Sequence, residues 1–110
     1  MVSTQNRYAT EIGYEILKKG GNAVDAAVAV GFALAVTLPR AGNLGGGGFI
    51  LIYEKETQKV SSIDYRSAAP VAAKSEMFIS DNKVQRFGHL VNAVPGSVAG
   101  LLKALSLIHI

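Results

Sequence analysis

The sequence of 110 residues contains no cysteine. A disulfide framework, a thiol nucleophile and a cysteine-ligated zinc site are therefore excluded. Histidine is scarce as well: the chain has two, His89 and His109, and neither has a carboxylate at the spacing of metal ligands. Because a lone histidine is more often an ordinary hydrogen-bonded residue, no metal, no catalytic histidine and no other cofactor is expected.

Long hydrophobic runs are also missing. The longest covers residues 26–36, is interrupted by Gly31, and is too short to cross a bilayer as a helix. The first residues, MVSTQNRYAT, lack the basic segment followed by an apolar segment that is typical of a signal peptide. Neither a membrane span nor a leader is expected in this chain.

Charge is limited in amount and in pattern. Charged residues make up 17% of the chain and hydrophobic residues 49%, a balance that predicts one small folded domain with a packed core. The net charge is +3, but the lysines and arginines are scattered and do not alternate with aromatic residues. Such a pattern does not follow a phosphate backbone, so nucleic-acid binding is not expected.

The N-terminal part predicts two helices. Residues 9–19 place apolar side chains at helical spacing, and Gly20-Gly21 follows as a left-handed stop. Residues 23–36 are apolar on every side, with Asn22 as a candidate cap and Asp25 in the first turn. A helix that is apolar all round is a buried one.

A glycine-rich segment, AGNLGGGG at residues 41–48, leads directly into the apolar residues 49–53. Its spacing matches neither a dinucleotide fingerprint nor a P-loop, and it runs from helix to strand, whereas phosphate loops run from strand to helix. We interpret it as backbone that passes close to another element, with angles that only glycine tolerates. The continuous apolar run predicts a strand covered on both faces, and residues 60–65 are its predicted hairpin partner.

The remainder predicts an irregular segment and one more helix. Pro95-Gly96 is read as a turn, and the helix is expected from Ser97, a possible N-cap, to about Leu105. The fold class is therefore α+β: two helices, a buried β-hairpin, an irregular segment and a helix. Helices on one face of the hairpin leave its other face in need of a cover that this chain does not obviously provide.

Arg66 is the residue with the strongest case for binding. It follows the second predicted strand and precedes a proline-containing loop, where a rigid sheet meets a segment that can form a site. Its planar guanidinium can bind a carboxylate with two parallel hydrogen bonds. The alternative is a structural ion pair with Asp64, two positions earlier on the same strand face.

Three ordered motifs resemble one known family. The segment from Gly20 to Phe49, with its AVDAAVAVGFALAV helix and AGNLGGGGF loop, resembles the start of γ-glutamyltransferases. Residues 64–70, DYRSAAP, resemble the D-(F/Y)-R-x-x-A-P element of that family, and residues 94–100, VPGSVAG, resemble its P-G-(S/T)-V-A-G element. The resemblance covers about residues 2–104. Leu38 departs from it, since the family often has His or Glu before the proline.

The resemblance implies a fold and an activity. It implies a fragment of an αββα N-terminal-nucleophile hydrolase sandwich, made as one precursor that cleaves itself into two subunits. The threonine exposed on the small subunit attacks the γ-glutamyl amide of a donor such as glutathione, and the acyl group passes to water, an amino acid or a peptide. Residues 1–104 match the beginning of the large subunit, so no catalytic residue is expected here and the chain alone should be inactive.

Further roles follow from the same resemblance. It implies that Arg66 binds the donor's α-carboxylate, that the small subunit of the same precursor is a partner, and that the full-length protein is periplasmic or extracellular. One alternative is a sister acylase of the same fold, such as a cephalosporin or glutaryl acylase. Another is a non-catalytic stand-alone domain.

The ends of the chain carry separate expectations. Met1 is expected to be an internal methionine, because the family usually has residues ahead of it. Residues 105–110, LSLIHI, are encoded by CTGTCTCTTATACACATC, which resembles a transposon end used as a sequencing adaptor. We expect an adaptor origin for these residues, the alternative being a genuine apolar helix end.

Overall fold

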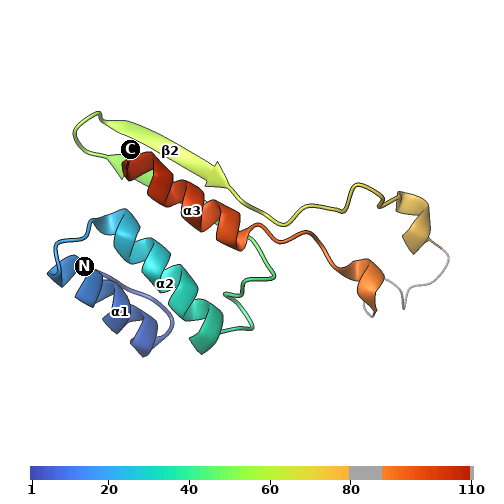
Figure 1. Cartoon of the computed structure of the whole chain (residues 1–110), viewed down its shortest axis with the longest axis horizontal. Coiled ribbons are helices and arrows are strands. Elements are labelled where there is room, and N and C mark those ends of the chain that lie inside the picture. Colours follow the sequence, from blue (N-terminus) through green and yellow to red (C-terminus); the bar gives the residue numbers. More distant parts are fainter. Residues whose placement is uncertain (80–87, 110) are drawn as a thin grey trace.

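The computed structural model describes residues 1–79 and 88–109. Within these ranges the elements are α1 (Arg7–Lys18), α2 (Ala23–Thr37), β1 (Phe49–Glu54), β2 (Lys59–Asp64), the 3₁₀ helices η1 (Ser75–Phe78) and η2 (His89–Val91), and α3 (Ser97–Ile108). The two strands pair as an antiparallel sheet. The predicted α+β class and element order are confirmed, and Figure 1 shows a body of helices and hairpin from which an arm extends between β2 and α3.

The first two helices begin at asparagine caps. The Asn6 side-chain oxygen accepts hydrogen bonds from the amides of Tyr8 and Ala9 at 3.0 and 3.2 Å, so α1 starts two residues before its predicted start. At α2 the Asn22 side chain accepts from the Asp25 amide, and the Asp25 carboxylate accepts from the Asn22 amide at 2.9 Å. This reciprocal capping box confirms the predicted start of α2.

Helix α2 lies between α1 on one side and α3 with the hairpin on the other (Figure 1). Gly13 of α1 makes room for Val30 of α2, since a methyl group at Gly13 would lie 2.7 Å from Val30 Cγ2. On the opposite side Gly31 of α2 faces the Leu101 side chain of α3. Neighbours on two sides explain why α2 has no polar stripe, as its all-round apolar sequence predicted.

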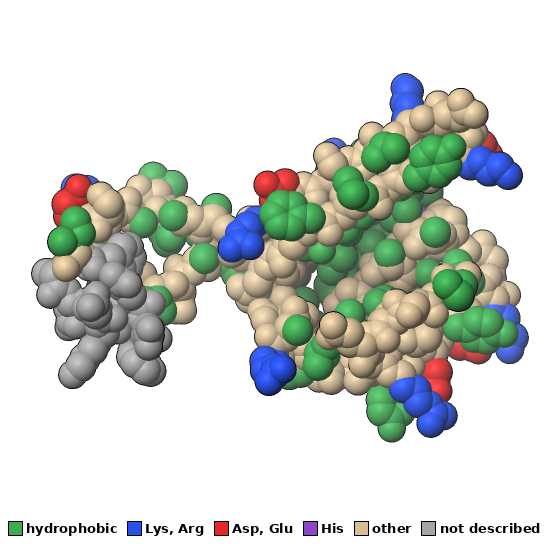
Figure 2. All heavy atoms as spheres, turned by 180° about the vertical axis from the view of Figure 1, so that it is seen from behind, with side chains coloured by type: hydrophobic (Ala, Val, Ile, Leu, Met, Phe, Trp, Pro, Cys, Tyr) green, Lys and Arg blue, Asp and Glu red, His purple; other side chains and the backbone are tan. Residues whose placement is uncertain are grey.

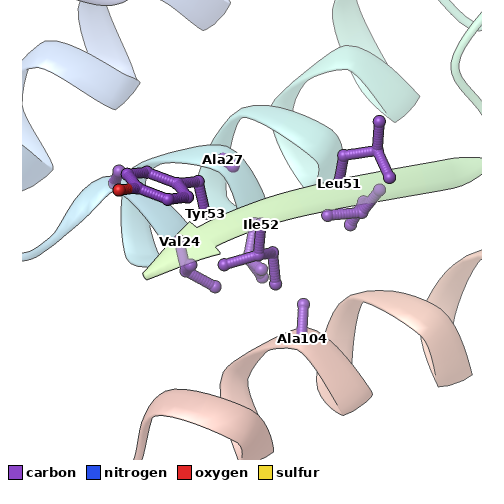
Figure 3. A pocket seen from close by; sticks show the side chains of 9 residues that line it. Val24, Ala27, Leu51, Ile52, Tyr53 and Ala104 are labelled. Carbon is purple, nitrogen blue, oxygen red and sulfur yellow. The ribbon is translucent and has the colours of Figure 1, made fainter. Parts of the chain in front are cut away.

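The strand register separates two faces of the hairpin. The inner face carries Ile50, Ile52 and Ile63, which pack with α2 and α3, and Ile52 is only 7% exposed. Figure 3 shows Ile52 between Val24 and Ala104, while Leu51 points away from them. The helices that cover this face are therefore α2 and α3, and α1 packs behind α2.

The outer face of the hairpin consists of Phe49, Leu51, Tyr53 and Val60, which are 63, 77, 63 and 68% exposed. In Figure 2 hydrophobic side chains lie open along the hairpin, and on this face of the molecule lysines and arginines are spread apart. The described residues cover one face of the hairpin, so they do not provide the second cover that the continuous apolar run predicts. The predicted need for a further cover remains.

Two details of the C-terminal part correct the sequence interpretation. Gly96 occupies the N-cap position of α3, and Ser97 is the first helical residue, whose hydroxyl donates to the Asn43 carbonyl 2.9 Å away. The helix also runs to Ile108 rather than ending near Leu105, because its last turn packs partly against the core. The adaptor origin of residues 105–110 stays a prediction, which the codons of the gene would test.

The arm comprises the described residues between Arg66 and Gly96. It includes η1 and η2, and Figure 1 shows it leaving the body and returning to it. The radius of gyration is 16.9 Å, larger than the roughly 13 Å of a compact chain of about 100 residues. Where the arm leaves and re-enters the body, Ala68 and Val94 exchange two backbone hydrogen bonds of 3.1 and 2.8 Å.

Candidate functional site

Arg66 lies at the junction between the end of the hairpin and the start of the arm. The Tyr65 amide still donates to the Gly48 carbonyl at 3.0 Å, which extends the strand pairing by one residue. Arg66 follows directly, and its side chain is exposed. The position predicted from the sequence, at a rigid strand end next to a loop, is therefore the position observed.

The alternative ion pair with Asp64 is not formed. The Asp64 carboxylate instead accepts a hydrogen bond from the backbone amide of Arg66 at 2.9 Å. Among the ion pairs of the described residues none involves the Arg66 guanidinium. An aspartate two residues before an amide readily forms this local turn, which fixes the backbone of Arg66 and leaves its charged group available.

Three segments distant in sequence meet at Arg66. The Gly46 carbonyl accepts hydrogen bonds from the amides of Gly96 and Ser97 at 2.9 and 3.1 Å. The Ser97 hydroxyl donates to the Asn43 carbonyl, so three hydrogen bonds tie the start of α3 to the glycine-rich segment. The structure thus brings together residues 41–48, 64–70 and 94–100, the motifs that the sequence singled out.

Glycines make this junction possible by their size. A methyl group on Gly47 would lie 2.5 Å from the Ser67 amide nitrogen and 2.8 Å from the Arg66 carbonyl carbon. A methyl group on Gly96 would collide with the Tyr65 carbonyl. The predicted close approach is confirmed, but the predicted special angles are not. Among the described residues the glycines with positive φ are Gly20 and Gly88, outside this segment.

Sequence reasoning missed two side chains of the junction, Tyr65 and Ser97. The ring of Tyr65 lies against Gly48 and Gly100, and Ser97 is buried. Both line a cavity of about 240 Å³ between α2, the glycine-rich segment and α3. A signal was available for Tyr65: Gly96 and Gly100 stand four residues apart, so they mark one face of α3 that admits a large neighbour.

A second cavity, of about 160 Å³, lies between α2, β1 and α3 (Figure 3). It is lined by apolar side chains such as Val24, Val28 and Ile50, with Tyr53 at its margin. A binding site usually adds a few convergent polar groups to such a lining, and they are missing here. We regard it as a gap in core packing.

The titratable groups of the described residues do not form a second site. His109 Nε2 lies 2.6 Å from Asp25 Oδ1, linking the end of α3 to the start of α2. The hydrogen bond from His109, followed by that from the Asn22 amide, lowers the pKa of Asp25. His89 is exposed at the start of η2. Within residues 1–79 and 88–109 no three potential ligands gather closely enough for a metal ion.

The helices of the described residues are short in comparison with the thickness of a bilayer. None of them combines the length and the hydrophobicity that crossing a membrane requires.

Comparison with known proteins identifies relatives along almost the whole chain. The family model described as "Gamma-glutamyltranspeptidase" matches residues 9–107. The "Glutathione hydrolase proenzyme" of Escherichia coli is 52% identical over 110 residues, which is 96% of this chain and 19% of the relative. The chain therefore spans about a fifth of the length of that protein.

Solved structures agree with the sequence matches. The γ-glutamyltranspeptidase of Helicobacter pylori superposes with a TM-score of 0.91 at 42% identity, covering 97% of this chain and 32% of that one. The enzyme of Pseudomonas nitroreducens, solved in complex with L-DON, gives a TM-score of 0.89 at 44% identity, covering 96% of this chain and 32% of that one.

Proposed function

The chain belongs to the γ-glutamyltranspeptidase (γ-glutamyltransferase) family, and from this premise we propose that it supplies the donor-binding arginine of a γ-glutamyl-transferring enzyme. The observation that carries the proposal is the junction at Arg66. There, three motif segments converge on a strand end whose guanidinium is exposed and unpaired among the described residues.

The proposed reaction is acyl transfer from a γ-glutamyl donor such as glutathione. The hydroxyl of an N-terminal threonine on the small subunit attacks the amide carbonyl and gives its proton to the threonine's own amine, which passes it to the donor's amine as the amide bond breaks. Water, an amino acid or a peptide then takes the acyl group and restores the threonine. Since that threonine belongs to the small subunit, this chain alone is expected to be inactive.

Arg66 would hold the donor at the end remote from the reacting bond. The α-carboxylate of a γ-glutamyl group is separated from the scissile amide, so gripping it orients the amide toward the nucleophile. A guanidinium offers two parallel charge-assisted bonds in a fixed plane. The Asp64 bond to the Arg66 amide supports this role, because it anchors the backbone without neutralising the side chain.

The outer face of the hairpin suggests how the chain joins the rest of the enzyme. In an αββα sandwich a second layer of sheet covers such a face, and Phe49, Leu51, Tyr53 and Val60 present a continuous apolar surface for it. We propose that this layer comes from the same precursor, which cleaves itself into large and small subunits. The assembled enzyme is proposed to act in the periplasm or outside the cell.

The test uses a full-length enzyme. Residues 1–104 are expressed either with the downstream sequence of their own gene or in place of the matching segment of the Escherichia coli relative. Arg66→Ala should weaken binding of a γ-glutamyl anilide by roughly 2–5 kcal/mol, seen as a large rise in KM. Arg66→Lys should also be costly, because lysine keeps the charge but loses the planar fork. Self-cleavage should proceed in both variants, since it involves no donor carboxylate.

The control separates binding from general damage. A donor that lacks the α-carboxylate should be turned over equally by the wild type and by Arg66→Ala. Arg7→Ala removes an exposed arginine of α1 that pairs with Glu11, and it should leave the turnover of both donors unchanged. If Arg66→Ala lowers activity equally on both donors, or blocks self-cleavage, Arg66 is a structural residue and the proposal is wrong.

A further inference from the structure

The peptide bond between Tyr65 and Arg66 is enclosed by the backbones of two glycines. Gly47 approaches the Tyr65 carbonyl, the Arg66 carbonyl carbon and the Ser67 amide, and Gly96 approaches the Tyr65 carbonyl from the start of α3. A methyl group on Gly96 would lie 2.8 Å from the Tyr65 carbonyl carbon and 3.3 Å from the Arg66 carbonyl oxygen. The atoms in the way are backbone atoms, which cannot rotate aside as a flexible side chain does.

The two glycines are also fixed to each other. Gly46, next to Gly47, accepts the hydrogen bonds from the amides of Gly96 and Ser97. Just beyond Arg66, Ala68 exchanges hydrogen bonds with Val94, which lies two residues before Gly96. A side chain added to either glycine therefore cannot be accommodated by withdrawing one segment alone. The peptide that carries Arg66 is what has to move.

We propose that Gly47 and Gly96 are positioning residues for Arg66, which set the distance between the guanidinium and the site of γ-glutamyl transfer. The inference rests on the proposed function of Arg66. A γ-glutamyl donor has a fixed length between its α-carboxylate and its scissile amide. Displacing the Arg66 backbone changes the span that the enzyme accepts, and a misplacement of about 1 Å can cost on the order of 100-fold in rate.

Gly100, in the first turns of α3, provides the contrast. A methyl group there would meet the ring of Tyr65 and not the backbone of Arg66. Gly100 therefore serves the packing of α3 on the sheet, and its substitution is expected to affect folding rather than the choice of donor.

The test measures Gly47→Ala and Gly96→Ala in the full-length enzyme with donors that have or lack the α-carboxylate. We expect kcat/KM for the carboxylate-bearing donor to fall by about ten- to a hundredfold, mainly through KM, with turnover of the other donor changed less than about twofold. In the Arg66→Ala background the same substitutions should cause no further loss, because the residue through which they act is gone. Gly45→Ala is the matched control, since a methyl group there would lie near only the Asn43 side chain, 3.3 Å away.

The outcomes separate this inference from the proposed function. Suppose that Arg66→Ala distinguishes the two donors. If both glycine variants then lower kcat/KM equally for the two donors, or if their losses add fully to the loss caused by Arg66→Ala, the positioning role is wrong and the proposed function stands. If Arg66→Ala itself does not distinguish the donors, both fail. If neither glycine variant folds or cleaves itself, the glycines serve the fold and the positioning role is overturned. Normal kinetics in both variants also overturns it.

Discussion

The two faces of the β1–β2 hairpin have nearly the same hydrophobic content and opposite surroundings. Ile50, Ile52 and Ile63 of the inner face pack against α2 and α3, whereas Phe49, Leu51 and Tyr53 of the outer face are exposed. A solitary exposed leucine is ordinary, but a row of large apolar side chains on one sheet face marks a surface meant to be covered. One face of the hairpin is thus packed in a hydrophobic core, and the other is an apolar surface that the described residues leave exposed.

The inner face of the hairpin and the candidate site at Arg66 are also stabilised by different kinds of contact. The inner face is fixed by hydrophobic contacts, while Arg66, at the end of the same hairpin, is fixed by backbone hydrogen bonds and by glycines that admit close backbones. Packing tolerates small adjustments of side chains, but a backbone junction does not. The position of Arg66 should therefore be more sensitive to one added methyl group than most of the core is to one removed.

The largest effect expected from the comparison of faces concerns Ile52. Ile52→Ala should reduce the free energy of unfolding of this chain by about 2–5 kcal/mol, because it leaves a cavity among Val24, Leu101 and Ala104. Leu51→Ala, on the neighbouring strand position, should change it by no more than about 0.5 kcal/mol. Urea unfolding of the two variants in dilute solution, followed by circular dichroism, measures both. Equal losses would mean that the outer face is already covered in this chain.

A smaller effect is expected at the start of α2, one of the two helices that cover the inner face. Asn22→Ala removes the side chain that accepts from the Val24 and Asp25 amides at 2.8 and 3.0 Å, and should cost about 1 kcal/mol. Asn22→Ser keeps an acceptor and should stay close to the wild type in the same unfolding experiment. A loss of similar size in both variants would show that the cap does not depend on the side-chain oxygen.

The smallest change in stability is expected from a charge on the outer face. Leu51→Lys should alter the free energy of unfolding of the isolated chain by less than about 0.5 kcal/mol. It should raise the concentration at which the chain stays in solution, because a lysine interrupts the apolar surface and discourages association of sheet edges. Ile52→Lys, the matched variant on the inner face, should unfold the chain. Light scattering and size-exclusion chromatography measure these outcomes, and unchanged association of Leu51→Lys would speak against the outer face as the surface through which the chain associates.

The local elements were predictable to within a few residues for identifiable reasons. Asn22 with Asp25 three positions later specified the start of α2, and Gly20, with φ of 92°, specified the stop after α1. The start of α1 was missed because its cap, Asn6, precedes the apolar repeat on which the prediction relied. The end of α3 was missed because the last turn is stabilised by contacts with the core, which periodicity does not report.

The candidate site was predictable in its central residue but not in its support. Arg66 was identified from its place after a strand and from the motif around it. The alternative of an ion pair with Asp64 is not what forms: the Asp64 carboxylate accepts from the Arg66 amide instead, since two residues on one strand face can also form a local turn through the backbone. Ser97 was interpreted as a helix cap because its partner, Asn43, lies far away in sequence, and the packing of Tyr65 was missed although the spacing of Gly96 and Gly100 indicated it.

By itself the amino-acid sequence determined what depends on neighbours a few residues apart: the cap of α2, the existence and order of the helices and strands, the absence of a thiol from this chain and the family to which three short motifs belong. Only the tertiary structure decided which face of the hairpin the helices cover and how residues 41–48, 64–70 and 94–100 meet around one peptide bond. The physical reason is that capping and periodicity are local energies. Close approach of backbones depends instead on how three segments pack together in the folded chain. A glycine is needed there only because backbone atoms of another segment lie where its side chain would be.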